Sequence, residues 1–87
     1  MKKIELFVMK SCPYCLQALR WQDELIDENP DYGKINIEII DENQEAARAA
    51  QYDYYYVPTY YVGSEKLHEG AACRADIKAV LDAALTE

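Results

Sequence analysis

The feature that most constrains the fold is a pair of cysteines placed where the hydrophobic pattern changes. The apolar run from Lys3 to Met9 is typical of a short strand buried on both faces. Shortly after it comes Cys12-Pro13-Tyr14-Cys15. From Pro13 to about Asn29 the apolar residues follow helical spacing, and proline fits the first helical position because that N–H has no intrahelical partner. The tetrapeptide is therefore predicted to open the first helix.

A second strand and a short helix are predicted after this first helix. Asp31-Tyr32-Gly33 is typical of a turn. Asp41 and Gln44 have the spacing of a capping box, which predicts a helix over Glu45 to Ala50. Between the turn and Asp41, three isoleucines alternate with polar residues, which predicts a strand: Ile35, Ile37 and Ile39. Ile40 extends the apolar end of this strand.

The last third of the chain predicts a hairpin and a closing helix. Tyr60 to Val62 and Lys66 to Glu69 flank a Gly63-Ser64 turn, as in an antiparallel hairpin. An amphipathic helix follows, with its apolar stripe at Ile77, Val80, Leu81, Ala84 and Leu85. The order β-α-β-α-β-β-α over residues 1–87 predicts a single α/β domain. Because its strand–helix–strand opening implies a parallel pair, we expect a mixed four-stranded sheet flanked by three helices.

Charge and composition exclude several classes of function. The chain has 16 acidic and 9 basic residues, a net charge of -7, and such a surface repels nucleic-acid phosphates and anionic lipids. Glu5 and Lys10 make the apolar stretch after the basic N-terminus too short for a signal peptide. No later segment is apolar for long enough to span a bilayer. We therefore expect a cytoplasmic monomer that binds neither nucleic acid nor membrane.

The two cysteines of the tetrapeptide suit thiol chemistry. Residues three apart on a helix share a face, so Cys12 and Cys15 can alternate between dithiol and disulfide. Only a thiolate attacks a disulfide, and Cys12 is next to the unpaired N–H groups of the helix start, which favour an anion. Lys10 adds a positive charge nearby. We predict Cys12 as the attacking nucleophile and Cys15, on the apolar stripe, as a shielded resolving thiol.

Two other interpretations of the cysteine pair stay open. Two core cysteines can lie three apart by chance. The chain also offers the four nitrogen and sulfur ligands of a structural zinc site: Cys12, Cys15, His68 and Cys73. Zinc cysteines usually lie on turns that wrap the ion, whereas Pro13 indicates a helix start, so we expect no metal.

Together these features resemble the glutaredoxin family of the thioredoxin-like superfamily. The resemblance rests on the strand from Ile4 to Met9, on Cys12-Pro13-Tyr14-Cys15, and on Val57-Pro58 ahead of a strand, and it covers nearly the whole chain. It implies the thioredoxin fold. It also implies that Pro58 is cis and faces the cysteine pair, leaving the Val57 backbone free to pair with a substrate as an added strand.

The resemblance further implies glutathione as a co-substrate and no tightly bound cofactor. The residues it nominates for binding substrate or glutathione are Lys10, Pro13, Tyr14, Val57 and Pro58. The sequence departs from the family at Tyr56, where relatives have threonine. A larger departure lies between Gly70 and Arg74, where the acidic residue that would pair with the glutathione ammonium is missing and Asp76 follows further on.

We therefore predict a thiol–disulfide oxidoreductase that reduces a protein disulfide or a glutathione mixed disulfide in a glutathione-linked cycle. One alternative is a thioredoxin-like electron donor that a thioredoxin reductase reduces. A structural zinc module and a non-catalytic binding module are further alternatives. The reductant or reductase and a disulfide-containing protein are the expected partners.

Several residues outside the tetrapeptide have two interpretations. The tyrosines at 52, 54, 55 and 56 either present an aromatic docking surface or pack alternately beneath the loop, and packing is favoured. Cys73 is expected to be a small, buried and inert cysteine, although the turn before the last helix can bring it near the active site. His68 is expected on the hairpin surface and Trp21 in the core.

Overall fold

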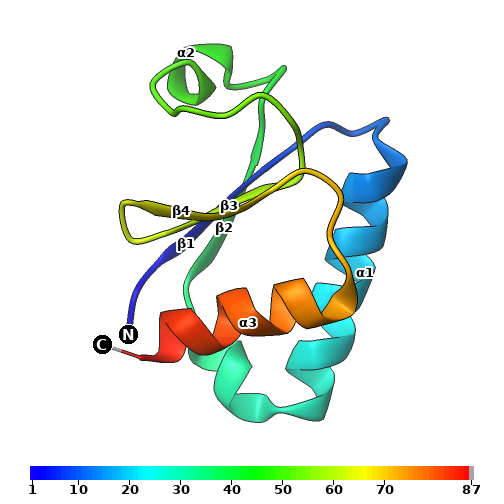
Figure 1. Ribbon diagram of the computed structural model, residues 1–87, viewed down its shortest axis with the longest axis vertical. Helices are drawn as coiled ribbons and strands as arrows, with labels where there is room; N and C mark the ends of the chain where they lie inside the picture. Colours follow the sequence, from blue (N-terminus) through cyan, green and yellow to red (C-terminus); the bar gives the residue numbers. More distant parts are fainter. Residues whose placement is uncertain (87) are drawn as a thin grey trace.

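Helices lie on both faces of a central sheet in the computed structural model, which describes residues 1–86 (Figure 1). The mixed four-stranded sheet with three helices is the fold that the sequence predicts, and one short 3₁₀ helix, η1, is added to it. Within residues 1–86 no helix is long and apolar enough to cross a membrane. The elements are β1 (Ile4–Val8), α1 (Pro13–Glu28), η1 (Pro30–Lys34), β2 (Ile37–Asp41), α2 (Ala46–Ala49), β3 (Thr59–Val62), β4 (Glu65–Glu69) and α3 (Arg74–Leu85).

The strands follow the order β2-β1-β3-β4. β1 and β2 are parallel, with Ile4 opposite Ile37, as the strand–helix–strand pattern predicts. β3 runs antiparallel to β1 and continues into β4 through a turn at Gly63, whose φ of 63° lies in the region that favours glycine. The predicted hairpin is therefore confirmed.

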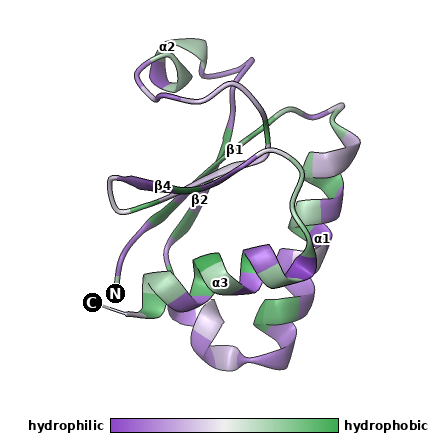
Figure 2. Ribbon diagram, viewed as in Figure 1, coloured by the Kyte–Doolittle hydropathy of each residue, from purple (hydrophilic) through white to green (hydrophobic). Residues whose placement is uncertain are grey.

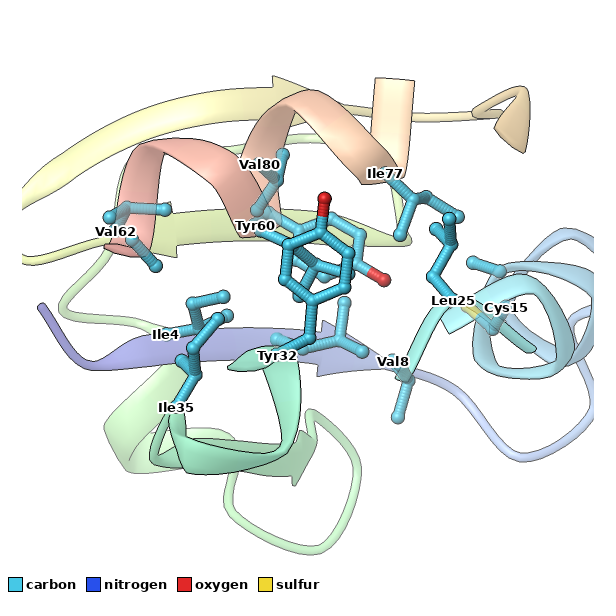
Figure 3. Close-up of a cluster of buried hydrophobic side chains, with 14 residues drawn as sticks. Ile4, Val8, Cys15, Leu25, Tyr32, Ile35, Tyr60, Val62, Ile77 and Val80 are labelled. Atoms are coloured by element: carbon cyan, nitrogen blue, oxygen red, sulfur yellow. The ribbon is translucent and has the colours of Figure 1, made fainter. Parts of the chain in front are cut away.

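β1 is buried along its whole length and separates two hydrophobic clusters. Ile4 and Val8 belong to the larger cluster, which α1 and α3 cover (Figure 3). Phe7 belongs to the smaller cluster on the other face, beneath α2. Figure 2 shows apolar residues along β1 and β2, and apolar and polar residues interspersed along α1 and α3, as expected of helices with one buried face. The partly buried Trp21 packs against the larger cluster, as predicted.

The turn predicted at Asp31-Tyr32-Gly33 is instead the middle of η1. The side chain of Asn29 accepts a hydrogen bond from the N–H of Asp31 (3.1 Å), so a new helical turn begins directly after α1 ends. Tyr32 is consequently buried, and its hydroxyl donates to Asp82 of α3.

The second strand begins later than predicted, and its isoleucines do not share one buried face. β2 begins at Ile37; Ile40 is fully buried, whereas Ile39 is 50% exposed. β2 is an edge strand, and α1 and α3 pack mainly on the central strands, which leaves Ile39 uncovered. Ile40 packs with Phe7 on the opposite face.

The capping box predicted at Asp41 and Gln44 is wrong. α2 begins at Ala46, and among residues 1–86 no side chain caps it. Asp41 ends β2, and its carboxylate accepts hydrogen bonds from the N–H groups of Asn43 (2.8 Å) and Gln44 (3.3 Å). Such local side-chain bonds compete with helix formation, so Asp41 shapes a turn ahead of α2.

An ion network fixes α2 to the sheet. Arg48 of α2 donates to Glu5 of β1 (2.8 Å) and to Glu38 of β2 (2.5 Å). Lys3 pairs with Glu38 (2.7 Å). Glu5 is only 9% exposed, and it also accepts a hydrogen bond from the Tyr52 hydroxyl (2.8 Å), so the buried carboxylate is fully partnered. The network thus holds both α2 and the start of the segment that leads to β3.

A buried hydrogen bond between α1 and β3 gives the first testable prediction. The Tyr60 hydroxyl donates to Oε1 of Gln22 (2.9 Å), and both residues are buried. Tyr60→Phe leaves that oxygen without a partner, so we expect the free energy of unfolding to fall by about 1–3 kcal/mol. In a Gln22→Leu background the same change should cost much less. Chemical denaturation of the four proteins measures the coupling, and equal losses in both backgrounds would contradict this interpretation.

Candidate active site

Cys12 occupies the N-cap position of α1. It is partly buried, and its N–H donates to the carbonyl oxygen of Met9 (3.2 Å), so the chain turns directly from β1 into the helix. Pro13 is the first helical residue, as predicted. The unpaired N–H groups and the positive end of the helix dipole stabilise an anion at such a position. The helix start therefore suits the thiolate form of cysteine, which is the form that attacks disulfides.

Cys15 lies one turn further along α1 and is 1% exposed. The pKa of its thiol is raised to about 12 in all: burial is the largest cause, a backbone hydrogen bond with Met9 acts in the opposite sense, and the neighbouring Cys12 adds to the rise. Cys15 is thus a neutral, shielded thiol at physiological pH. Both thiols are free, so the structure corresponds to the dithiol form.

The Val57-Pro58 peptide approaches Cys12 from the segment before β3. This peptide is cis, and the Cys12 thiol donates to the carbonyl oxygen of Val57 at 3.9 Å, a long and weak sulfur hydrogen bond. Pro58 is buried, and its carbonyl oxygen accepts a hydrogen bond from the N–H of Gly70 (2.8 Å). Within residues 1–86 the N–H of Val57 donates no hydrogen bond, so it is available to a ligand.

The other predicted binding residues lie at the exposed side of the helix start. Lys10 is exposed, and among the described residues it forms no ion pair. Tyr14 is 63% exposed, and Leu16 beside it is 54% exposed. The structure therefore places Lys10, Pro13 and Tyr14 around Cys12 on an accessible surface, close in sequence to the nucleophile that they were predicted to serve.

The four tyrosines before Pro58 divide into two pairs. Tyr52 and Tyr54 pack against Phe7 in the smaller cluster in tilted arrangements, with ring centroids 4.7 Å and 5.1 Å from it. Tyr55 and Tyr56 are 87% and 71% exposed. The favoured prediction of packing thus holds for one pair, although the buried and exposed residues do not alternate strictly. The exposed pair adjoins Val57 and adds aromatic surface to the site.

Cys73 is exposed, so the prediction of a buried cysteine is wrong. It is the N-cap of α3, and its N–H donates to the carboxylate of Asp76 (3.0 Å) in a capping box. An N-cap residue precedes the helix and can face solvent while the helix behind it is buried. Arg74 pairs with Glu28 of α1 (2.5 Å), which ties the two helices together.

The four side chains proposed as zinc ligands do not gather. In the part of the chain that the structure describes, no three His, Cys, Asp or Glu side chains are close enough to hold a metal ion. His68 is half-buried on β4, where Nε2 lies 3.1 Å from the carbonyl oxygen of Gly70 and shapes the turn after the strand. The expected surface position of His68 on the hairpin is therefore only partly correct.

One residue of the site has no counterpart in the sequence-based predictions. Glu69, at the end of β4, accepts hydrogen bonds from the backbone N–H groups of Tyr55 (2.5 Å) and Tyr56 (3.0 Å). Its partners lie more than ten residues earlier in the chain, and the contact exists only because the hairpin folds back on the segment before Pro58. No spacing or motif in the sequence indicates it.

Comparison with known proteins places these features in a family. No family model matches the sequence. A thioredoxin of Methanocaldococcus jannaschii is 33% identical over 69 residues, which is 79% of this chain and 79% of that protein. The solution structure of a thioredoxin-like protein from Clostridium perfringens aligns with a TM-score of 0.72 and 25% identity over 100% of this chain and 74% of the other. A malarial protein shares the fold, with a TM-score of 0.75 and 20% identity over 99% of both chains.

The architecture, with a mixed sheet between α1 and α3 on one face and α2 on the other, defines a thioredoxin-fold protein. The identity to a thioredoxin over most of the chain goes further: the chain belongs to the thioredoxin-like superfamily, with a function of the redox type.

The difference between the two thiols of α1 predicts an order of alkylation. Because the pKa of Cys15 is raised to about 12, this buried cysteine is a neutral thiol near neutral pH, whereas Cys12 is partly exposed. We expect iodoacetamide to modify Cys12 at least about tenfold faster than Cys15 at about pH 8. Fragmentation of the tryptic peptide of residues 11–20 distinguishes the two sites. In denaturant the rates should converge; equal rates in the native protein would show that Cys15 is not shielded.

Proposed function

We propose that the protein is a dithiol–disulfide oxidoreductase in which Cys12 attacks a substrate disulfide and Cys15 resolves the product. The observation that carries this proposal is the position of Cys12 at a helix start, with Sγ 3.9 Å from the carbonyl oxygen of Val57. A polypeptide that pairs with the Val57 backbone as an added strand would present its disulfide to Cys12. The free N–H of Val57 supports this mode of binding.

The proposed reaction has two exchange steps. The Cys12 thiolate attacks one sulfur of the substrate disulfide; a mixed disulfide forms, and the other substrate sulfur leaves as a thiolate. Cys15 then transfers its proton to the leaving thiolate and attacks Cys12 Sγ. This step forms the Cys12–Cys15 disulfide and releases the second substrate sulfur. The substrate gains two electrons, the protein loses two, and an external thiol or reductase returns it to the dithiol.

Burial governs the second step. Desolvation is the largest cause of the raised pKa of Cys15, and it persists when Cys12 is in the mixed disulfide and its charge is gone. The proton of Cys15 must therefore be removed inside a nearly closed environment. Proximity compensates, because the two cysteines lie on one turn of α1 and their reaction is intramolecular.

The proposal has two forms, which differ in the electron donor that returns the protein to its dithiol form. The similarity to a thioredoxin favours a thioredoxin-like donor that a thioredoxin reductase reduces. Lys10 and Tyr14, exposed near Cys12, support glutathione as the co-substrate instead. Asp76, the first acid after the turn from Gly70 to Arg74, already accepts a hydrogen bond from the N–H of Cys73, which weakens its suitability for binding the glutathione ammonium. We therefore place the thioredoxin-like cycle first and the glutathione-linked cycle second.

Substitution of the cysteines tests the proposed roles. Cys12→Ser should lower insulin disulfide reduction by more than about a hundredfold, because a hydroxyl is not ionised near neutral pH. Cys15→Ser should retain the first step and accumulate a mixed disulfide, visible by intact-mass spectrometry. Cys73→Ser is the matched control, because serine is a good N-cap and activity should persist. Activity in folded Cys12→Ser would refute the assignment and leave a non-catalytic binding module as the better interpretation.

Two coupled assays distinguish the donors. NADPH oxidation is followed with thioredoxin reductase in one arm, and with glutathione and glutathione reductase in the other. We expect turnover in the thioredoxin reductase arm, because the turn from Gly70 to Arg74 lacks an acid for the glutathione ammonium and Asp76, which follows it, is engaged in a helix cap. Turnover confined to the glutathione arm would reverse our order and support the glutaredoxin assignment.

A further inference from the structure

The segment before Pro58 needs an external support. Tyr55 and Tyr56 are 87% and 71% exposed, so the packing of their side chains does not fix their backbone. The segment belongs to neither a helix nor a strand, and exposed irregular segments open readily unless hydrogen bonds hold them. Yet the Val57 carbonyl lies 3.9 Å from Cys12 Sγ, and a substrate that pairs there needs that geometry in advance.

Glu69 supplies a support from the end of β4. One carboxylate oxygen, Oε2, accepts hydrogen bonds from the N–H groups of both Tyr55 (2.5 Å) and Tyr56 (3.0 Å). The other oxygen, Oε1, accepts one from Nζ of Lys66 (2.7 Å). Hydrogen bonds to an ionised carboxylate are about twice as strong as neutral ones. The cation at the same time orients the carboxylate that holds the two N–H groups.

Neighbouring contacts confine the same segment on both sides of Val57. Lys66 also donates to the carbonyl oxygen of Asp53 (3.1 Å). The Thr59 hydroxyl donates to the carbonyl oxygen of Tyr56. The N–H of Gly70 donates to the carbonyl oxygen of Pro58. The N–H of Val57 is left without a partner inside residues 1–86. The backbone is thus held immediately before and after Val57, whose N–H remains available.

We propose that Glu69 is a positioning residue for polypeptide substrates, because its carboxylate holds the backbone of Tyr55 and Tyr56 so that Val57 is presented beside Cys12. This inference rests on the proposed function and deepens it, since it assigns substrate docking and nucleophilic attack to separate groups. Glu69 accepts hydrogen bonds from the N–H groups of Tyr55 and Tyr56 and takes no part in the exchange of sulfur atoms.

Substrates with and without a peptide backbone distinguish this role from a general one. A short synthetic peptide with an intramolecular disulfide requires pairing with Val57. Dithiodipyridine has no backbone and requires only an accessible Cys12 thiolate. Loss of the Glu69 carboxylate should therefore slow the peptide reaction and spare the reaction with dithiodipyridine.

The test measures single-turnover rate constants of the reduced protein in a Cys73→Ser background, which leaves Cys12 and Cys15 as the only thiols. We expect Glu69→Ala to slow the peptide reaction about tenfold and to change the dithiodipyridine reaction by less than about twofold. Glu69→Gln retains an oxygen acceptor without the charge and should fall between. Glu65→Ala, at an exposed position on the same strand, is the matched control and should leave both rates unchanged.

Amide hydrogen exchange reports on the support independently of activity. In Glu69→Ala the N–H groups of Tyr55 and Tyr56 should exchange faster than in the parent protein. Faster exchange with an unchanged peptide rate would show that Glu69 is merely structural and would overturn the proposal. An equal fall in both reactions would place its effect on Cys12 and would also overturn it. A parent protein that reacts with neither disulfide would refute the proposed function itself, and the role of Glu69 with it.

Discussion

Burial of β1 on both faces is the constraint on which the rest of the structure depends. The strand is also paired along both edges, with β2 on one side and β3 on the other, so its carboxyl end is fixed in every direction. Cys12 follows that end and opens α1. Pro58 precedes β3, whose Thr59 is paired with Phe7 near the same end of β1. Two segments 45 residues apart in the chain, at Cys12 and Val57, therefore meet beside one strand end.

The two thiols of the site differ because a helix start is a boundary between environments. Cys12 is at the N-cap, where N–H groups lack helical partners, while Cys15 is one turn inside and belongs to the core that α1 shares with α3. Their spacing keeps the sulfurs within reach of each other, and the difference in burial gives them different chemistry. Attack from outside is thereby directed to one thiol, and the second is kept for the intramolecular step.

Local pattern was sufficient to predict α1, the hairpin, α3 and the depth of Cys15, because these depend on periodicity and turn chemistry within a few residues. Two predictions failed where a distant partner decides the outcome. Ile39 follows the strand pattern but is left uncovered by the helices at the sheet edge. Glu69 went unnoticed because its partners are brought to it only by the completed hairpin. The error at Cys73 is local: its position as the N-cap of α3, outside the buried face of the helix, was not recognised.

One carboxylate and one buried thiol set the pH range over which this geometry holds. Lys66 first, and then the N–H groups of Tyr55 and Tyr56, lower the pKa of Glu69 to about 2, so its contribution to stability is complete above the unfolded value of about 4.3 and is lost as the pH falls toward 2. Cys15 acts in the opposite direction: its pKa is raised to about 12, so its contribution is complete below the unfolded value of about 8.5 and is lost as the pH rises. Between these limits neither group titrates. The pH dependence of the first exchange step in that range therefore reports the chemistry of the attacking thiol and its substrate, and not changes in these two groups.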